Sequence, residues 1–418
     1  MESMIKDKIV NHLCTNDFIF PSQHGFTAKR SCLTNLLDYL EDVTNFVDNG
    51  DPVDVVYLDL AKAFDKCPHV RLGKVLEAHG VTGPVLGWIQ AWLRDREQRV
   101  VLNGEESAWL PVKSGVPQGS VLGPTLFVIY INTLDMELGV GPDILSKFAD
   151  DTKIGNIVNS EESRNVLQSV IDCAANWSNR WQMMFNPSKC TVIHFGHNNQ
   201  HYKYNLGGQE LKDETSEKDL GVYVSSDLKP SIQCQKAAGK ANGVLGRMAR
   251  SLSYRNKDIW LRLYRIYVRP ILEYSVQAWS PWMCKDVKKL EDVQRRAVRM
   301  TSGLKGVTYE DKLKEVGMLS LEARRERGDM IQVWKILNKY DKVDETKWFR
   351  RVDTSRHTMT RMSTCPYNLQ LGNVHLDTRK YFFSQRVVVK WNNLPELVKE
   401  SVSLNGFKNA YDEYMKLQ

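Results

Sequence analysis

Apolar and polar positions follow different periods in different parts of the chain. Residues 5–48 show helical spacing around Ile5–Leu13 and Cys32–Phe46. Further on, short β-branched and aromatic runs predict strands at 53–59, 98–103, 143–149, 153–158, 191–196 and 220–225. Helical spacing between them predicts helices at 70–79, 84–94, 120–135 and 160–181. Strands mixed with helices predict an α+β class.

Beyond residue 230 the pattern becomes mainly helical. We expect helices at 231–250, 256–269, 286–301, 309–316 and 320–339. A loop-rich stretch follows at 341–380 and contains Thr354–Thr364, which is rich in Thr, Ser, Arg and Met. Apolar patterning returns from Tyr381 to the last residue.

The predicted helix at 256–269 is amphipathic. Its apolar positions are Ile259, Trp260, Leu263, Tyr264, Ile266 and Tyr267. Arg262, Arg265 and Arg269 recur every three or four residues, so they are expected to share the opposite face. We expect Pro270 to end or kink the helix.

The net charge of +7 is unevenly distributed. Residues 1–230 contain 21 Lys and Arg against 30 Asp and Glu, whereas residues 231–300 contain 15 against 5. A basic part after an acidic part suits contact with a nucleic-acid backbone, although basic faces are often only solvated. No apolar run reaches the roughly 18 residues of a membrane span. The eight cysteines are scattered, which favours a reducing, intracellular compartment, nucleus or cytoplasm.

Two adjacent acids, Asp150 and Asp151, lie between two predicted strands. They repel each other, and a divalent cation offers a reason for the pair because Mg²⁺ prefers carboxylate oxygens. The alternative is a solvated turn, since Asp is a common turn residue. Asp59 ends another buried run, Val55–Leu58. Two-metal phosphoryl transfer needs carboxylates from separate strands, which these three residues would provide.

A loop between these acids has features of a ligand-binding segment. Gly119 lets a backbone approach a ligand closely, and Gln118 offers both a donor and an acceptor. Taken alone, the segment is better explained as an ordinary loop before a helix.

Taken in order, Asp59, Pro117-Gln118-Gly119 and Phe148-Ala149-Asp150-Asp151 resemble the reverse transcriptases of non-long-terminal-repeat (LINE-type) retrotransposons, in particular the chicken-repeat-1 and jockey-like branch. The resemblance implies a right-hand polymerase palm, an antiparallel sheet with helices. Its expected parts are partial fingers at 1–50, the palm at 51–228, a helical basic thumb-like region at 229–340 and a retroelement C-terminal region at 341–418.

The resemblance also implies roles for individual residues. Asp59, Asp150 and Asp151 would be catalytic ligands of two Mg²⁺ ions, with Mn²⁺ as a possible substitute. Phe64, Gln118 and Gly119 would contact the incoming nucleotide, with Phe64 excluding a ribose 2′-hydroxyl; its alternative is a core aromatic. Lys189, in Asn186-Pro187-Ser188-Lys189, would be a general acid near the leaving pyrophosphate or else a surface lysine. Expected nucleic-acid contacts are Lys29, Arg30, Arg262, Arg265, Arg269, Arg295 and Arg296.

The function expected from this resemblance is RNA-directed DNA polymerisation, a nucleotidyltransferase reaction. The partners would be an RNA template, a DNA primer and deoxynucleoside triphosphates. Family members carry an Arg-Pro-Ile-Ser-Leu segment upstream of a Gln-His-Gly-Phe stretch, here Gln23–Phe26, and Met1 lies downstream of where that segment would be. We therefore expect truncated fingers. An inactive remnant that binds nucleic acid, a metal-dependent nuclease and a non-catalytic interaction protein remain alternatives.

Overall fold

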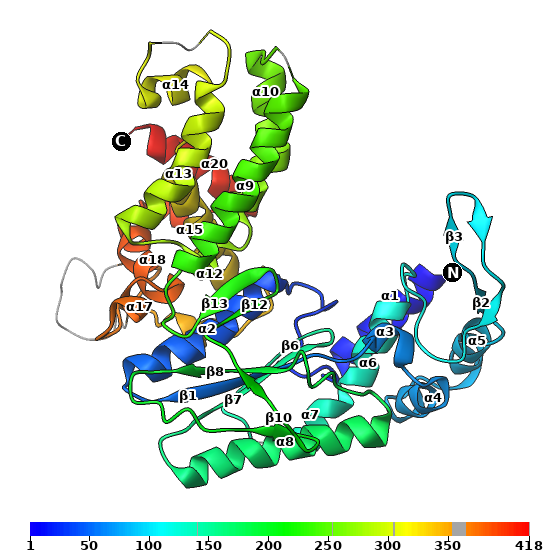
Figure 1. Cartoon of the computed structure of the whole chain (residues 1–418). Coiled ribbons are helices and arrows are strands. Elements are labelled where there is room, and N and C mark those ends of the chain that lie inside the picture. The colour runs from blue at the N-terminus through cyan, green and yellow to red at the C-terminus, as the bar shows by residue number, and fades with distance from the viewer. Residues whose placement is uncertain (140, 253, 304–305, 353–364, 418) are drawn as a thin grey trace. The chain divides into compact units, whose positions relative to one another are not determined.

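The computed structural model describes residues 1–139, 141–252, 254–303, 306–352 and 365–417 (Figure 1). The chain forms two compact units. The first comprises Met1–Asn35 and Gly50–Glu214, and the second comprises Leu36–Asn49 and Thr215–Gln418. The first unit combines a sheet with helices and the second is mainly helical, which confirms the α+β class.

A five-stranded sheet organises the first unit. Its order is β11 (Lys212–Asp213), β8 (Thr191–Phe195), β1 (Val53–Leu58), β7 (Asp151–Ile157) and β6 (Ile144–Phe148). All pairs are antiparallel except β11 with β8. Every residue of β1 is buried, as a central strand requires. The strands predicted at 53–59, 143–149, 153–158 and 191–196 are confirmed.

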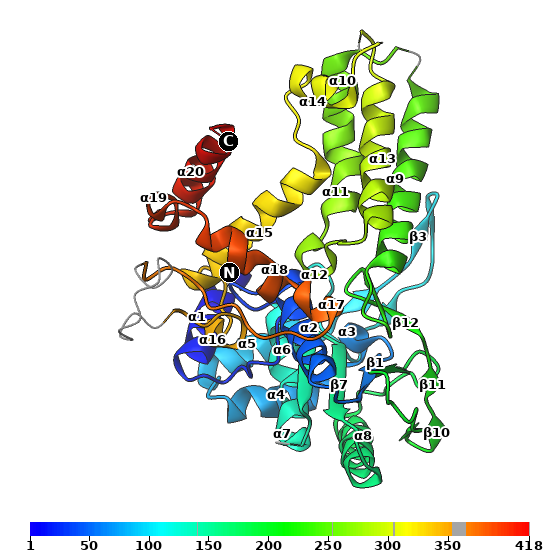
Figure 2. The ribbon, with the colours of Figure 1, turned by 90° about the vertical axis from the view of Figure 1, so that its left-hand side faces the viewer.

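Helix α8 (Glu161–Trp181) packs against β7 and lies along the sheet in both views (Figures 1 and 2). Ser160 caps its first turn by accepting from the amide of Ser163. Its buried positions Leu167, Ile171 and Ala174 recur at helical spacing, which is why the sequence predicts this helix well. The other helices of the first unit are α1 (Glu2–Thr15), α3 (Ala63–Lys66), α4 (His69–Ala78), α5 (Gly83–Leu93), α6 (Gly123–Ile131) and α7 (Thr133–Leu138).

The helix predicted at 120–135 is wrong as one continuous element. It begins at Gly123 and is divided at Asn132 into α6 and α7. The side chain of Asn132 donates to the carbonyl of Phe18 (2.5 Å) and accepts from the amide of Phe20 (3.2 Å). These two hydrogen bonds, to residues that follow α1, fix Asn132 at the point where α6 ends and α7 begins.

The strand predicted at 98–103 is also wrong as one element. The segment forms two exposed pairings, β2 (Glu97–Gln98) with β5 (Leu110–Pro111) and β3 (Val101–Leu102) with β4 (Glu105–Glu106). Asn103 and Gly104 have φ of 51° and 91°, the conformation that a tight hairpin turn requires. A second small hairpin joins β9 (Asn205–Leu206) to β10 (Gln209–Glu210).

In the described part of the chain, the second unit contains one hairpin and most of the helices. β12 (Ser216–Asp219) and β13 (Val222–Ser225) pair around Leu220 and Gly221, both at positive φ, so the strand predicted at 220–225 is present. Residues Leu36–Asp48 of α2 (Cys32–Asp48) belong to this unit. The long helices α9 (Ser231–Ser251) and α13 (Cys284–Arg299) contact each other and run side by side in both views (Figures 1 and 2). The remaining helices are α10 (Lys257–Leu263), α11 (Arg269–Glu273), α12 (Val276–Trp279), α14 (Tyr309–Glu315), α15 (Leu321–Leu337), α16 (Glu345–Trp348), α17 (Asp377–Lys380), α18 (Phe383–Asn392), α19 (Glu396–Lys399) and α20 (Leu404–Lys416).

The helix predicted at 256–269 does not end at Pro270. A π-helical turn, Tyr264–Val268, follows α10 and leads directly into α11, where Pro270 occupies the first turn. A proline is tolerated in a first turn because its missing N–H needs no partner there. The expected inward face is partly wrong: Trp260 and Tyr264 are fully buried, whereas Ile259, Ile266 and Tyr267 are more than half exposed.

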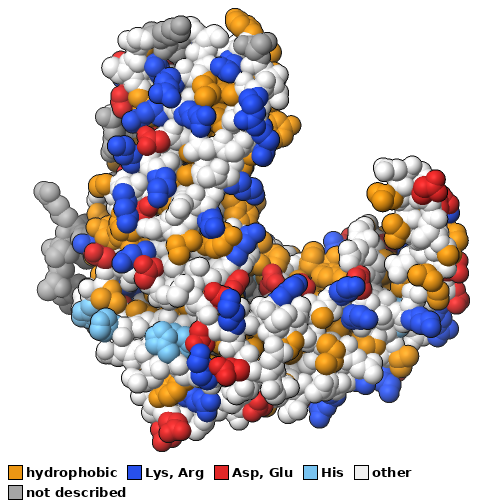
Figure 3. Space-filling model, viewed as in Figure 1, with side chains coloured by type: hydrophobic (Ala, Val, Ile, Leu, Met, Phe, Trp, Pro, Cys, Tyr) orange, Lys and Arg blue, Asp and Glu red, His pale blue; other side chains and the backbone are white. Residues whose placement is uncertain are grey.

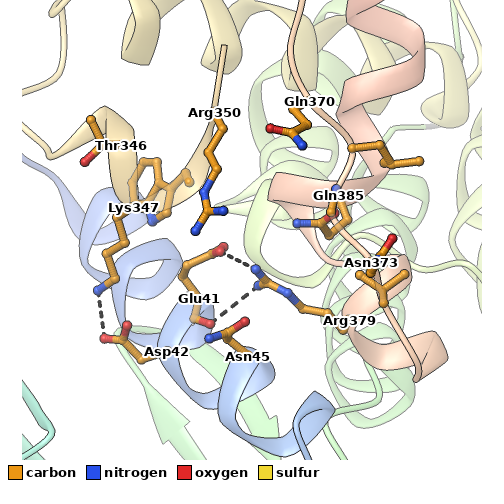
Figure 4. Close-up of a pocket in the computed structure, with 14 residues that line it drawn as sticks. Glu41, Asp42, Asn45, Thr346, Lys347, Arg350, Gln370, Asn373, Arg379 and Gln385 are labelled. Carbon is orange, nitrogen blue, oxygen red and sulfur yellow. Dashed lines mark hydrogen bonds and ion pairs between the residues drawn. The ribbon is translucent and has the colours of Figure 1, made fainter. Parts of the chain in front are cut away.

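A polar pocket of about 450 Å³ lies in the second unit, between α2 and the segments 346–350 and 370–385 (Figure 4). Its acids and bases are paired: Arg379 donates to Glu41 (2.5 Å), and Lys347 contacts Asp42 (2.7 Å). Burial raises the pKa of Asp42 to about 6, against the opposing effect of Lys347. These pairs attach α2 to residues late in the chain. The Thr354–Thr364 stretch lies outside the described residues.

No helix in the described ranges is both long enough and apolar enough to cross a membrane.

Candidate active site

Three aspartates predicted as metal ligands lie at the same end of the sheet in the first unit. Leu58, the last residue of β1, pairs with Thr152 of β7, so Asp59 follows directly beside the start of that strand. β6 and β7 form a hairpin in which Phe148 pairs with Asp151. Ala149 and Asp150 form its turn, and Ala149 has a φ of 59°. The hairpin thus carries the acid pair to the strand end that carries Asp59.

The electrostatics show that two of these carboxylates interact. Burial raises the pKa of Asp150, and the negative charge of Asp59 raises it further, although a backbone hydrogen bond opposes the shift. The Oδ2 atom of Asp59 is buried and has no hydrogen-bond partner among the described residues. The Nζ atom of Lys189 lies 3.4 Å from that oxygen. An interacting pair of carboxylates with an unsatisfied oxygen suits a hard divalent cation.

The third carboxylate is placed differently. Asp151 is exposed at the first position of β7. Within the described residues, no set of three or more His, Cys, Asp and Glu side chains is close enough to hold a metal ion. Asp59 and Asp150 therefore form the centre of the candidate site.

The chain around Lys189 is fixed to the strand end by two hydrogen bonds. The amide of Asn186 donates to the carbonyl of Asp59 (2.8 Å), and the amide of Asp59 donates to the Sγ of Cys190 (3.3 Å). These bonds explain why Lys189, 130 positions later in the chain, lies beside Asp59. Its side chain is 66% exposed, so it is free to reorient.

The predicted nucleotide-contacting residues also come together. The amide of Val116 donates to the carbonyl of Phe64 (2.8 Å), and Nε2 of Gln118 donates to Asp65 (2.9 Å). Phe64 is half-buried and stacks on Phe127 with ring centroids 4.3 Å apart. The ring is therefore packed against the core and still partly accessible, which leaves both of its predicted roles open.

Gly119 has the backbone freedom that the sequence suggested. Its φ is 80°, and a Cβ atom there would meet nothing within 4 Å. The backbone at this position is open to a ligand. Gly115, in the same loop, is needed for packing, because a Cβ there would lie 2.6 Å from the Cα of Asp65.

Some predicted nucleic-acid contacts are engaged inside the protein. Arg30 donates to the backbone carbonyls of Pro21 and Gln23, the latter at 2.9 Å, so its guanidinium group stabilises that segment. Lys29 is exposed. Arg262, Arg265 and Arg269 do not form the exposed stripe that was expected. Of the three, only Arg262 is exposed, and the other two are partly buried. Arg265 donates to the carbonyl of Val316 (3.1 Å), and Arg269 lies 3.7 Å from Glu273.

The two arginines predicted on α13 differ from each other. Arg295 is exposed, with its guanidinium carbon 4.7 Å from the centroid of the Tyr309 ring. Arg296 is half-buried and donates to Asn242 of α9 (3.2 Å).

Sequence reasoning missed a basic stripe on α9. Lys236, Lys240 and Arg247 are exposed and lie on one helix face, since their spacings of four and seven residues repeat the helical period. Gly239 and Gly243 lie beside them, and a Cβ atom at either would meet nothing within 4 Å. Lys and Arg side chains spread over the surface formed by α9 and α13 (Figure 3). The helical spacing of these three residues is visible in the sequence, as it is for the arginines of 256–269.

These features together define the palm of a nucleic-acid polymerase. They are the mainly antiparallel sheet, the acid pair at the tip of its hairpin, the aspartate directly after β1, and the nearby loop of Gln118 and Gly119. The family model for reverse transcriptase (RNA-dependent DNA polymerase) matches residues 1–224, more than half of the chain. The chain belongs to this family.

Two relatives specify the kind of reverse transcriptase that the chain resembles. It is 23% identical over 316 residues to the RNA-directed DNA polymerase from mobile element jockey of Drosophila melanogaster, covering 72% of this chain and 34% of that protein. It is 24% identical over 310 residues to the probable RNA-directed DNA polymerase from transposon X-element of the same fly, with the same coverage. The chain spans about a third of the length of these curated relatives. A telomerase structure from Candida albicans, solved with a fragment of telomeric RNA, aligns with a TM-score of 0.43 and 10% identity over 76% of this chain and 56% of that one.

Proposed function

We propose that this chain is the polymerising part of a non-LTR retrotransposon protein and extends a DNA primer along an RNA template. The observation that carries the proposal is that Asp59, directly after β1, and Asp150, in the turn between β6 and β7, lie at the same end of the sheet. The loop of Gln118 and Gly119 bonds to Phe64 and Asp65, which follow Asp59 in the chain. Its relatives are named RNA-directed DNA polymerases, which supports the same activity here.

Asp59 and Asp150 are the residues that would hold divalent metal, with Asp151 next to them. Two Mg²⁺ ions bound there would supply charge neutralisation for a triphosphate and activation of a primer 3′-hydroxyl. Lys189, 3.4 Å from Asp59, carries a proton on Nζ that it can give to a departing pyrophosphate. Phe64 would border the sugar of the incoming nucleotide, and the open backbone at Gly119 would lie against the nucleotide or template.

The exposed cations of α9 and α13 would hold the template–primer duplex. Phosphate contacts of this kind are independent of sequence and weaken as salt rises. The residues we assign to this contact are Lys236, Lys240, Arg247, Arg295 and Arg299, all of which are exposed.

The experiment is primer extension on a primed RNA template with deoxynucleotides and Mg²⁺. Asp150→Asn should abolish extension and leave duplex binding unchanged within about twofold, because the phosphate contacts lie elsewhere. Asp172→Asn is the matched control, since it removes one negative charge from the exposed face of α8. Equal extension by Asp150→Asn and the control would refute the assignment. A product that forms without deoxynucleotides would instead indicate a nuclease.

A further inference from the structure

The segment Ser22–His24 lies along the free edge of the palm sheet, next to the acid-bearing hairpin. Gln23 forms a parallel bridge with Lys147 of β6, the strand at the sheet edge. The amide of His24 donates to the carbonyl of Lys147, and the amide of Lys147 donates to the carbonyl of Ser22, both at 2.8 Å. The segment therefore adds one bridged residue to the edge of the sheet, two residues before the turn that contains Asp150.

The side chain of Gln23 forms hydrogen bonds to that turn. It is fully buried, and its Oε1 atom accepts from the amides of Ala149 (2.9 Å) and Gly25 (2.8 Å). Its Nε2 atom donates to the carbonyl of Ala149 at 3.4 Å. Ala149 has a φ of 59°, a conformation that non-glycine residues seldom adopt. One amide side chain thus bonds both backbone groups of the residue before Asp150.

Two neighbours of Gln23 fit the same arrangement. A Cβ atom at Gly25 would lie 2.3 Å from the amide nitrogen of Ala149, so only glycine permits this close approach. Phe26 contacts Phe64 edge to face, with ring centroids 5.9 Å apart. The segment therefore contacts both the acid-bearing turn and the ring predicted to border the nucleotide.

The backbone of the segment is itself well anchored. Arg30 donates to the carbonyl of Gln23, and Asn35 donates to the carbonyl of Lys147 (3.0 Å). The ammonium group of Lys147 is fully buried and pairs with Asp135, which also accepts from Ser22. A glutamine on such a fixed base can impose a conformation on the turn.

We propose that Gln23 is a positioning residue that holds Ala149 in its left-handed conformation and thereby sets the place of the Asp150 carboxylate. This inference rests on the proposed polymerase function for its effect on catalysis. Its effect on the turn stands apart from catalysis and is measured separately.

The test compares Gln23→Met, which keeps the side-chain length and loses all three side-chain hydrogen bonds, with Gln23→Glu, which keeps the accepting oxygen. Tyr204→Phe is the matched control, because it removes one buried hydrogen bond (to Asp54, 2.7 Å) from the other end of β1. Hydrogen–deuterium exchange of peptides covering residues 147–152 should accelerate about five- to tenfold in Gln23→Met. It should change little in the control.

Primer extension supplies the second measurement. In Gln23→Met, we expect kcat to fall roughly 10- to 100-fold or the Mg²⁺ requirement to rise by a similar factor, as for other residues that orient metal ligands. The KM for deoxynucleotide should change less than kcat. Gln23→Glu should retain more activity than Gln23→Met. If Gln23→Met does not fold, the exchange at residues 147–152 is measured in Gln23→Glu, and an exchange rate equal to that of the wild type and of the control would overturn the positioning role.

The outcomes separate the two proposals. Unchanged exchange at residues 147–152 in Gln23→Met would overturn the positioning role, whatever the activity. So would a wild-type rate and Mg²⁺ requirement in that variant. A wild-type chain that extends no primer would count against the polymerase function alone, and the exchange measurement would still decide the role of Gln23.

Discussion

At the scale of single residues, Asp59 is the most informative side chain. It ends a strand buried along its whole length, and one of its carboxylate oxygens lacks a hydrogen-bond donor in the described part of the chain. The ammonium group of Lys189 lies 3.4 Å from that oxygen, but its side chain is 66% exposed, so it compensates the charge only weakly, and the nearby charge of Asp150 adds repulsion. A bound cation would relieve that repulsion and supply the oxygen with a partner, so metal should stabilise the fold.

The first prediction concerns that stabilisation. Mg²⁺ or Mn²⁺ at about 100 times its dissociation constant should stabilise the wild-type chain by about 2.7 kcal/mol, measured as a rise in the thermal midpoint. Asp59→Asn should lose this increase. Without metal it should be about as stable as the wild type, because it loses both the repulsion with Asp150 and the largely exposed ion pair with Lys189. An equal metal-dependent shift in both proteins would contradict the assignment of Asp59.

Motif order made Asp59, Asp150 and Gln118 predictable as a group, because those motifs specify chemistry directly. The partners of basic residues were not predictable in that way. Periodicity predicts which face of a helix a side chain occupies, but it does not predict which other segment packs against that face. Arg265 donates to Val316, 51 residues later, and no local pattern contains that information.

At the scale of elements, the pairing of β1 with β8 brings Asp54 and His194 together. Asp54 accepts from His194 Nδ1 (2.6 Å), Tyr204 (2.7 Å) and Asn199 (2.7 Å). Asp213 lies 3.4 Å from the other ring nitrogen, and the ring of His201 lies 4.7 Å away. Burial disfavours the charged imidazole, but the bonds and charges of Asp54 and Asp213 outweigh it and raise the pKa of His194 above 6.5.

The second prediction follows from this pKa. A raised folded-state pKa means that the charged imidazole stabilises the fold fully below the unfolded value of 6.5, and that this contribution is lost as pH rises through the folded value. Denaturant unfolding of the wild type and His194→Gln should be compared from about pH 5 to about pH 9. The stability advantage of the wild type should be largest at the acidic end and shrink above neutrality. A difference that does not vary with pH would be the contrary result.

The third prediction concerns α9 and α13. Lys240→Gln should weaken duplex binding equally for different sequences and reduce the slope of log K against log salt by about 0.9, the value for one lost phosphate contact. Lys416→Gln, an exposed change in α20, is the control and should leave the slope unchanged. Arg265→Gln should lower stability without altering the slope, since its guanidinium group bonds Val316 inside the unit. Identical slopes for Lys240→Gln and the control would exclude this face from binding.

Most elements were predictable where one face is buried, as in α8. Prediction failed where burial is nearly complete or where another segment intervenes. α6 is buried on nearly all sides, so its apolar run has no period that marks its ends, and the bonds of Asn132 to Phe18 and Phe20 fix the break. The π-helical turn before Pro270 likewise depends on how α10 and α11 pack.

At the scale of the whole molecule, each of the two compact units is built from segments that are far apart in the sequence. By packing, Leu36–Asn49 and Thr215–Gln418 form one unit, and the parts that the resemblance implied at 1–50 and 341–418 stay predictions. Buried and partly buried ion pairs connect α2 with the late part of the chain. Glu41 of α2 binds Arg379, 338 residues later, with side chains 5% and 8% exposed. No charge pattern along the sequence identifies such a pair.

The fourth prediction tests whether this pair holds the second unit together. Arg379→Met leaves Glu41 buried without its cation, so unfolding free energy measured by a probe in the second unit should fall by about 3–5 kcal/mol at neutral pH. Burial already raises the pKa of Glu41. Loss of Arg379 should raise it further, so the deficit should shrink as pH falls toward 4.5 and Glu41 takes up a proton.

Two further variants make this result specific to the buried pair. Adding Glu41→Gln to Arg379→Met should recover part of the loss, because it removes the uncompensated charge. Arg327→Met, which breaks the more exposed pair with Asp412 (26% and 40%), should cost at most about 1 kcal/mol. If both arginine variants lose the same stability, with no dependence on pH, the link between α2 and the late part of the chain is no stronger than a surface contact.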